Sequence, residues 1–467
     1  MDEVDALIAE IESGRPGDPA VEPTLRHARY SLVQALDALA SEQVRRQDYV
    51  AAKATLERAL QLEPKNADLL RNVSTVLLGL AGERGSRGDA AGAIAGLDEA
   101  IRFNPANAAA LNNLALVHAD RLDLDEAERV LRRAIAIDPD YAEAHFNLSR
   151  MLLMQRKYAE GWRENEWRWD CPAFPSTWRD FPYSPWTGTS LAGQTVLVWS
   201  EQGIGDEIMF SNPVADAIAE AKHIVLECNA RLVPIFRRSF AAAAVVARSD
   251  PPDPAIARAN IDVQLPLASL CLRYRASPEA FANNPGRYLF ADPERTRALR
   301  SRYAALGKGL LIGICWRSGN PKVGHERSAP LPLWDGVLAQ SGCRFVSLQY
   351  GGVADEIAAV RERLGVVIHN DKDVDPLASA EDWFAQVAAM DHVISIDNST
   401  IQVSGAQGIP TWTLLSHAPE WRFGAAGSGH DWHPSIRVFR QPAPGDWGPV
   451  FAAVEQALAE RLAAPGV

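Results

Sequence analysis

The sequence predicts an array of helical repeats followed by two parallel α/β domains. Three observations support this fold class. A proline-containing motif recurs three times in the first third of the chain, with apolar residues at helical spacing around it. After Leu191, short apolar runs alternate with helical stretches, as in parallel sheets covered by helices. The 467 residues exceed the usual size of one domain, and 47% hydrophobic content is enough for several packed cores.

The repeated segments are ALQLEPKNADLL from Ala59, AIRFNPANAAAL from Ala100 and AIAIDPDYAEAH from Ala134. Their prolines are 41 and then 34 residues apart, and 34 is the period of tetratricopeptide repeats, which this segment resembles. Each proline should follow one helix, and the nearby Asn or Asp should cap the next. We expect the glycine-rich residues 81–89 to lengthen a turn within the first long unit. Such arrays usually bind proteins, so any catalysis is expected elsewhere.

Residues 162–186 are rich in tryptophan, arginine and proline. A disordered tether would be poor in aromatic residues, so these rings are expected to pin the last repeat helix against the next domain. A carbohydrate-stacking surface made by exposed tryptophans is the alternative.

Composition limits the class of partner. The net charge of -12 argues against a general binder of nucleic acid or of anionic membranes. Five cysteines without Cys-x-x-Cys pairs favour reduced thiols over a disulfide framework or a zinc site. The acidic N-terminus is unlike a signal peptide, and no stretch is apolar for the ~20 residues of a membrane span. We therefore expect a cytoplasmic protein.

The α/β region begins with TVLVWSEQGIGDEIMF, from Thr195 to Phe210. Its apolar run predicts a buried strand, and Gly203 and Gly205 are expected to turn the backbone into a helix. Asp206 would then lie at the carboxyl end of a parallel strand, where ligands bind; it could also simply cap the helix. A second series of strands and helices starts at Leu310 and predicts a second α/β half across a cleft. The final helix, from Trp447, is expected to brace the first half.

Several short motifs occur in order along this region: EQGIGDE from Glu201, WRSGNP from Trp316, SLQYG from Ser347, DHVISIDNST from Asp391, GAQGIPTW from Gly405, WRFG from Trp421 and HPSIRVFRQ from His433. Together they resemble the heptosyltransferase-like (family 9) glycosyltransferases of the GT-B fold. The whole chain resembles bacterial proteins that join tetratricopeptide repeats to such a domain. A weaker, architectural resemblance is to O-linked N-acetylglucosamine transferases and flagellin-modifying transferases. The implied domains are repeats at 1–170, a junction at 171–190, an acceptor-side domain at 191–305 and a nucleotide-sugar domain at 306–467.

The resemblance implies roles for the first glycine loop. Asp206 would be the general base that takes the proton of the acceptor hydroxyl, with Glu207 as the fallback. Gln202, Gly203 and Gly205 would form the acceptor-side loop. An exposed Asp is a weak base, so burial that raises the pKa would be needed for strong catalysis.

On the donor side, a helix starting near Asn398 would direct its free amides at a phosphate, joined by the Ser399 and Thr400 hydroxyls. The alternative is that Asp397, Asn398 and Ser399 only cap that helix. The loop SGNPKVGHERS offers cations, of which Lys322 and Arg327 are preferred to His325; a solvated surface loop is the alternative. The remaining donor-binding candidates are Trp316, Arg317 and Gln349, and packing roles for Gln349 and Trp421 are equally compatible with the sequence.

Gln402 departs from the resembling proteins, which commonly carry a His after the DNST-type motif. Glutamine cannot carry a proton or a positive charge, so either the donor differs, for instance a nucleoside monophosphate sugar, or phosphate affinity is lower. The run DKDVDP, from Asp371, lacks the Gly and Glu that an EF-hand needs at its sixth and twelfth positions. We therefore expect no metal and no other cofactor.

The resemblance thus implies an inverting, metal-independent glycosyltransferase. It would move a sugar from a nucleotide-sugar to a protein acceptor held by the repeats, plausibly flagellin. Two alternatives stay open. One is an inactive transferase that acts as a scaffold, and the other is transfer to a lipopolysaccharide-type glycan.

Overall fold

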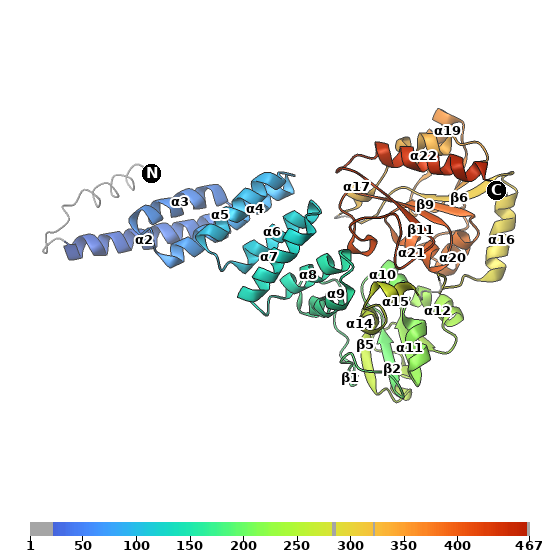
Figure 1. The fold of residues 1–467 in the computed structure, drawn as a ribbon, viewed down its shortest axis with the longest axis horizontal. Helices are drawn as coiled ribbons and strands as arrows, with labels where there is room; N and C mark the ends of the chain where they lie inside the picture. The colour runs from blue at the N-terminus through green and yellow to red at the C-terminus, as the bar shows by residue number, and fades with distance from the viewer. Residues whose placement is uncertain (1–21, 283–285, 321–322, 465–467) are drawn as a thin grey trace. The chain divides into compact units, whose positions relative to one another are not determined.

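The computed structural model describes residues 22–282, 286–320 and 323–464 (Figure 1). The chain divides into two compact units, and it passes from one to the other between Met151 and Leu152, within helix α8 (Ala142–Met154). This division comes before residue 170, the end of the repeats proposed from the sequence. The reason lies in helix α9 (Tyr158–Asn165), whose Tyr158 and Trp162 side chains are buried in the core of the second unit.

The first unit is a row of helices in which alanines occupy the tightest positions. Six alanines at equivalent places in every second helix, α3, α5 and α7, are at most 1% exposed: Ala52, Ala59, Ala93, Ala100, Ala127 and Ala134. Such small side chains let neighbouring helices pack closely. The side chains of Asn66 and Asn107 accept hydrogen bonds from backbone amides at the starts of α4 and α6, as predicted. The helices before α8 are α2 (Glu22–Arg45), α3 (Tyr49–Leu62), α4 (Ala67–Ser86), α5 (Ala90–Phe103), α6 (Ala108–Asp120) and α7 (Leu124–Ile137).

The glycine-rich segment 81–89 lengthens a helix, so the prediction of a longer turn is wrong. α4 has 20 residues whereas α6 has 13, and the additional residues continue the helix to Ser86. Gly82 and Gly85 lie on open parts of it, with no atom within 4 Å of an added Cβ. Each glycine costs about 1 kcal/mol in a helix. The packing of α5 along α4 offsets that cost.

The first lobe of the second unit contains a parallel sheet with the strand order β1-β5-β2-β3-β4. Every residue of β2 is buried, which explains its uninterrupted apolar sequence. The strands are β1 (Ser184–Pro185), β2 (Thr195–Trp199), β3 (His223–Cys228), β4 (Ala244–Ala247) and β5 (Val263–Pro266). The helices are α10 (Ile204–Phe210), α11 (Val214–Glu220), α12 (Val233–Ser239), α13 (Pro254–Arg258), α14 (Cys271–Tyr274) and α15 (Pro278–Ala282).

The second lobe contains a parallel sheet with the order β11-β10-β9-β6-β7-β8. Its edge strand β11 was not predicted, because arginines interrupt the apolar pattern of IRVFR. The strands are β6 (Leu310–Cys315), β7 (Cys343–Ser347), β8 (Ile368–His369), β9 (His392–Ile396), β10 (Thr411–Leu415) and β11 (Ile436–Arg440). The helices are α17 (Gly324–Arg327), α18 (Asp335–Leu338), α19 (Ala354–Leu364), α20 (Ala380–Ala388), α21 (Ser399–Ala406) and α22 (Gly448–Ala463).

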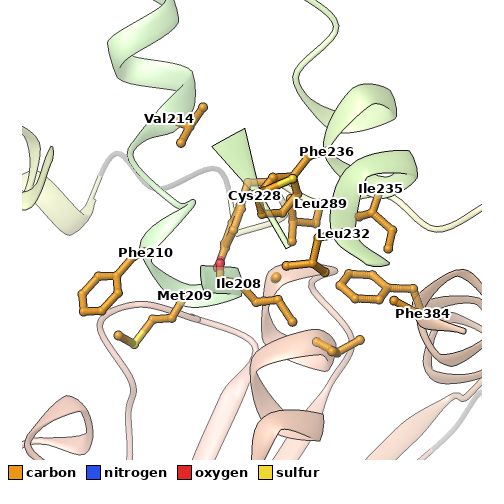
Figure 2. Packing of buried hydrophobic residues seen from close by; sticks show 14 of the residues in the cluster. Ile208, Met209, Phe210, Val214, Cys228, Leu232, Ile235, Phe236, Leu289 and Phe384 are labelled. Atoms are coloured by element: carbon orange, nitrogen blue, oxygen red, sulfur yellow. The ribbon is translucent and has the colours of Figure 1, made fainter. Parts of the chain in front are cut away.

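One hydrophobic core is shared by the two lobes. Figure 2 shows Ile208 and Met209 extending from α10 toward the ribbon of the second lobe, with Phe384 of α20 nearby. All three side chains are fully buried. α16 (Pro293–Ala304), which lies between the two lobes in sequence, packs on α20 of the second lobe. The lobes therefore form one folding unit.

The C-terminal helix α22 packs on the second lobe, so the expectation that it braces the first half is wrong. Its Val450, Phe451 and Leu458 side chains belong to the core of the second lobe. The ring of Phe451 lies 5.4 Å from that of Trp334, which ends the short helix Leu331–Trp334. The apolar side of α22 is therefore covered by the second lobe, to which the helix itself belongs.

The aromatic junction packs against the α/β lobes, as predicted. The Trp162 indole is 1% exposed and donates a hydrogen bond to the carbonyl oxygen of Arg275 at 2.8 Å. Rings of Phe210, Trp421 and Trp432 surround it, with centroids 5.5 to 6.2 Å away. Trp178 is 39% exposed, but it too packs on another ring, that of Trp199.

Candidate functional site

The two lobes touch where α10 and α21 begin. α10 follows the central strand β2 of the first lobe, and α21 follows β9 of the second. A Cβ added to Gly205 would lie 2.9 Å from the Ser399 hydroxyl oxygen, so the two helix starts are in contact. Because ligands bind outside the carboxyl ends of parallel strands, this junction is the candidate site.

The turn after β2 is made differently from the prediction. The left-handed residue is Gln202, with φ of 61°, whereas Gly203 has φ of -92°. The Gln202 amide donates a hydrogen bond to the Ser176 hydroxyl oxygen at 2.6 Å, which holds this uncommon conformation. Gly205 is needed for close approach to Ser399, and the expectation that the two glycines turn the chain is wrong.

Asp206 both caps α10 and reaches the second lobe. One carboxylate oxygen accepts a hydrogen bond from the Gly203 amide at 3.3 Å. The other lies 3.1 Å from Nη2 of Arg422, in the short helix Trp421–Phe423. The capping alternative is therefore confirmed for this residue, which also pairs with a side chain of the second lobe, Arg422, that the sequence analysis gave no role.

A charged cluster continues from this ion pair into the second lobe. Arg327 contacts Asp397 at 3.2 Å and Glu420 at 2.5 Å. Burial raises the pKa of Asp397, against the opposing effect of Arg327 and Arg422. Burial acts to lower the pKa of Arg422, but the carboxylates of Asp206, Glu420 and Asp397 outweigh it and raise that pKa. Both arginines of this cluster, Arg327 and Arg422, are thus paired with carboxylates.

Asn398 is the N-cap of α21. Its side-chain oxygen accepts a hydrogen bond from the Thr400 amide at 2.9 Å, and its amide group donates to the Cys315 sulfur at 2.9 Å. Thr400 is 2% exposed, whereas Ser399 is half-buried beside Gly205. The capping alternative accounts for Asn398, and Ser399 is the member of this motif that faces the other lobe.

The loop after β6 is held by Gln349. Its side-chain oxygen accepts hydrogen bonds from the amides of Trp316 at 3.1 Å and Arg317 at 2.9 Å. The Trp316 side chain is fully buried and its indole bonds to Glu356 at 2.5 Å. Arg317 also pairs with Glu356, at 3.3 Å. Gln349 thus holds the backbone of this loop, and the Trp316 side chain packs in the core of the second lobe.

A pocket of about 440 Å³ lies beside this loop, lined by residues 316–320 and by His325 among others. His325 is exposed. Lys322 lies outside the described residues. Of the predicted cations, the structure brings Arg327 to the junction of the lobes.

Gln402 is 2% exposed, and its side-chain oxygen lies 2.9 Å from Nε2 of His433. The His433 ring is fully buried and stacks beside the rings of His430 and Tyr288. A Cβ on Gly405 would lie 2.3 Å from this ring, so the glycine makes room for it. Burial lowers the pKa of His433 to about 3, so this imidazole is neutral at pH 7.

The carboxyl groups of Glu207 and Glu227 are buried in the first lobe. Glu207 is 3% exposed and accepts a hydrogen bond from the Asn229 amide at 2.8 Å. Burial raises its pKa to about 7. Glu227 is fully buried on β3 and pairs with Arg179 at 2.6 Å, and burial raises its pKa to about 6. Burial thus raises the pKa of both carboxyl groups toward neutrality.

Glu201 has a structural role that the sequence analysis missed. Its carboxylate accepts two hydrogen bonds from Arg168, at 2.8 and 2.9 Å, and both side chains are fully buried. It also accepts the amide of Ala268 at 3.1 Å. The EQGIGDE loop is therefore tied to the aromatic junction at one end and to the second lobe at the other.

The acidic run from Asp371 is an ion-pair site. Asp371 and Asp373 both contact Nη1 of Arg302, at 2.8 and 2.9 Å. Within the described ranges no group of three or more His, Cys, Asp and Glu residues has the arrangement of a metal site.

Among the described helices, none has the length and apolarity to cross a membrane.

The comparisons with known proteins agree with this architecture. A tetratricopeptide repeat model matches residues 130–163. The chain is similar to Protein FlbA of Caulobacter vibrioides, with 33% identity over 365 residues, or 72% of this chain. The chain spans 59% of the length of that relative.

Among solved structures, a family 9 glycosyl transferase from Veillonella parvula is 13% identical and covers 59% of this chain and 98% of its own, with a TM-score of 0.44. An O-GlcNAc transferase of Thermobaculum terrenum is 16% identical and covers 93% and 92%, with a TM-score of 0.29. An E. coli heptosyltransferase is 14% identical and covers 57% and 99%, with a TM-score of 0.37. These likenesses are distant. The repeat match and the element order of the structure itself confirm a tetratricopeptide-repeat protein with the paired parallel α/β lobes of the predicted GT-B fold.

Proposed function

We propose that this protein is a glycosyltransferase that moves a sugar from a nucleotide-sugar to an acceptor recruited by its repeats. The observation that carries the proposal is the junction of the lobes, where Asp206 of the first lobe contacts Arg422 of the second and α10 packs on α21. Sugar transfer needs a base for the acceptor hydroxyl and positive groups for the leaving nucleotide. The junction of the lobes supplies both kinds of group.

Asp206 is the proposed base. Each of its oxygens accepts one hydrogen bond, and a carboxylate oxygen has capacity for a second, so an acceptor hydroxyl can still reach it. Glu207 is the fallback, since its buried carboxyl has a pKa near neutrality. Direct attack by the acceptor, with Asp206 taking the proton, inverts the sugar carbon.

The charge of the leaving phosphate would fall to Arg327 and Lys322. Arg327 would exchange a carboxylate partner for the phosphate. Transfer without a metal is supported by Asp371 and Asp373, which are engaged by Arg302. A cytoplasmic location is supported by the spacing of the five cysteines, which includes no Cys-x-x-Cys pair. A protein acceptor such as flagellin is supported by the repeats and by the family resemblance.

A panel of UDP-glucose, GDP-mannose, ADP-glucose and CMP-sialic acid tests the activity, with thermal shift for binding and nucleotide release for turnover. Asp206→Asn should lower turnover by about 10²- to 10⁴-fold with unchanged donor affinity. Unaltered turnover would remove Asp206 from the role of base. Lys322→Ala should weaken donor binding, and unchanged affinity would make its loop a surface feature.

A scaffold without activity is the second candidate, because Arg327 is held by carboxylates and Gln402 is buried. Full-length protein that binds no donor of the panel but captures partners through its repeats would establish the scaffold. Parallel assays with flagellin and with lipopolysaccharide-derived oligosaccharide as acceptors separate protein transfer from glycan transfer.

A further inference from the structure

Arg422 connects the second lobe to the carboxylate of the first lobe. Its side chain is 16% exposed, and Nη2 lies 3.1 Å from the Asp206 oxygen. Its Nε is buried without a hydrogen-bond partner, whereas Nη2 donates a hydrogen bond to Asp206 Oδ1. The hydrogen bond to Asp206 is therefore made by the terminal nitrogen and not by Nε. The guanidinium also lies 5.7 Å from the centre of the Trp421 ring.

The segment that carries Arg422 is anchored to the helix that carries Asp206. The Trp421 ring lies nearly parallel to that of Phe210, at the last residue of α10, with centroids 6.4 Å apart. Trp421 also meets the Trp162 ring edge-on at 5.5 Å. Aromatic contacts of this kind favour particular ring arrangements, and here they join partly buried Trp421 to two buried rings. Arg422 is therefore presented to Asp206 by a rigid segment.

Two contacts from different directions fix the Asp206 carboxylate. The Gly203 amide, from its own lobe, holds one oxygen, and Arg422, from the other lobe, holds the second. The amide contact lies within the first lobe, whereas the arginine contact joins the two lobes. A carboxylate with one contact rotates about its Cβ–Cγ bond; one with two does not.

We propose that Arg422 is the positioning residue for Asp206, and that their ion pair across the junction of the lobes aims the carboxylate at the acceptor. This inference rests on the proposed function. In the transfer step the acceptor O–H proton passes to Asp206 and the acceptor oxygen bonds to the sugar carbon. The bond from that carbon to the phosphate oxygen breaks, and its electron pair leaves with the nucleotide. Arg422 keeps its charge beside the then neutral carboxyl group.

A double-mutant cycle tests the proposal with Asp206→Asn, Arg422→Gln and the combination, on nucleotide release from the best substrate of the four-donor panel. Arg422→Gln should lower kcat by about 10- to 100-fold through misplacement of the carboxylate, with KM for the donor unchanged. In the Asp206→Asn background the same change should have little further effect, because its partner is absent. Arg422→Lys should restore part of kcat. Arg363→Gln, which breaks an exposed ion pair with Asp335 in the same lobe, is the matched control and should change nothing.

Additive effects in the cycle would overturn the proposal and indicate a general structural role. A rise in donor KM with unchanged kcat would instead make Arg422 a donor-binding residue, which also overturns it. If Asp206→Asn itself leaves turnover unchanged, the proposed base has failed, and this outcome is distinct from additivity.

Hydrogen exchange gives a second readout that needs no donor. Arg422→Gln and Asp206→Asn should each speed exchange of the amides of residues 203–207, and the double variant should add nothing. Faster exchange confined to residues 421–432 would overturn the proposal.

Discussion

Gly205 sets how closely the two lobes approach. An added Cβ would meet the Ser399 hydroxyl oxygen at 2.9 Å and its Cβ at 3.4 Å, whereas one on Gly203 would meet only an Asp206 oxygen, at 3.4 Å. We predict that Gly205→Ala destabilises the protein by about 1 kcal/mol through overpacking. Gly203→Ala, in the same loop, should be nearly neutral. Thermal unfolding measures both.

Ser399→Ala should restore most of the stability lost in Gly205→Ala, because it removes the nearest atom. A Gly205→Ala protein as stable as Gly203→Ala would show that the lobes have room to separate there.

Glu207 makes stability depend on pH. Its usual pKa of 4.5 is raised to about 7 by burial, so the folded protein keeps this proton where the unfolded chain loses it. Its contribution is present below pH 4.5 and is lost as the pH rises through 7. We predict that Glu207→Gln stabilises the protein relative to the parent above pH 7 and has little effect below pH 4.5, since glutamine still accepts the Asn229 amide.

Denaturant unfolding at pH 4.5 and pH 8 measures this difference. An equal effect at both pH values would show that the Glu207 carboxyl does not titrate as burial implies.

Sequence patterns identify residues that make local structure better than residues that meet across the fold. Asn66 and Asn107 were recognised as caps because their partners are two or three positions away. Asp206 and Asn398 were placed correctly at helix starts for the same reason. Arg422 was missed, because its partner is 216 positions away and only the folded chain joins them.

At the scale of elements, α21 depends on a glycine at its buried side. A Cβ on Gly405 would lie 2.3 Å from the His433 ring, which is fully buried between other rings and cannot move aside. We predict that Gly405→Ala lowers the free energy of unfolding by about 1 to 3 kcal/mol. Gly352→Ala, where no atom lies within 4 Å of the added Cβ, is the control.

Thermal unfolding compares the two variants. If Gly405→Ala is as stable as Gly352→Ala, the His433 ring has another position, and the Gln402 contact is not part of the fixed core.

A helix or strand could be predicted where one pattern of apolar residues, either that of a helix or that of a strand, dominated its segment. β2, β3, β6, β9 and β10 are nearly or wholly buried, and their apolar runs identified them. The long α4 was misread because glycine is a poor helix former, and only its packing against α5 decides the conformation. The packing of α22 was predicted wrongly, because an amphipathic pattern shows which side of a helix is buried but not which part of the fold covers that side.

At the scale of the whole molecule, buried histidines make the fold sensitive to acid. Burial lowers the pKa of His392 from 6.5 to about 3, that of His433 to about 3, and that of His430 well below its usual value. As the pH falls, these histidines therefore bind protons in the unfolded chain but not in the folded protein. Stability from these groups is present above pH 6.5 and is lost as the pH falls toward 3. Glu207 and Glu227 act in the opposite sense between pH 4.5 and 7.

His392 isolates this effect, because both its ring nitrogens lack partners and its ring rests on Trp412. We predict that His392→Leu flattens the loss of melting temperature below pH 6.5. His325→Leu, at an exposed position, should leave the profile unchanged. Parallel profiles for His392→Leu and the parent would show that His392 is protonated in the folded state.

The order of domains could be predicted because repeats, junction and α/β alternation each have their own composition. The side chains that close the site could not, since the charged cluster of Arg327, Asp397 and Glu420 is drawn from three separate segments. Their mutual pairing follows from the folded arrangement of the second lobe, which no local spacing records.

The aromatic cluster around Trp162 also has a consequence for synthesis. Trp162 leaves the ribosome 270 residues ahead of Trp432, with which it packs at 6.0 Å. At a translation rate of ~5–20 residues per second, that interval is roughly 15 to 50 s. During it, α9 has no Trp421 or Trp432 to cover its indole. The newly made α9 is therefore an apolar surface that a chaperone can hold until the end of the chain arrives.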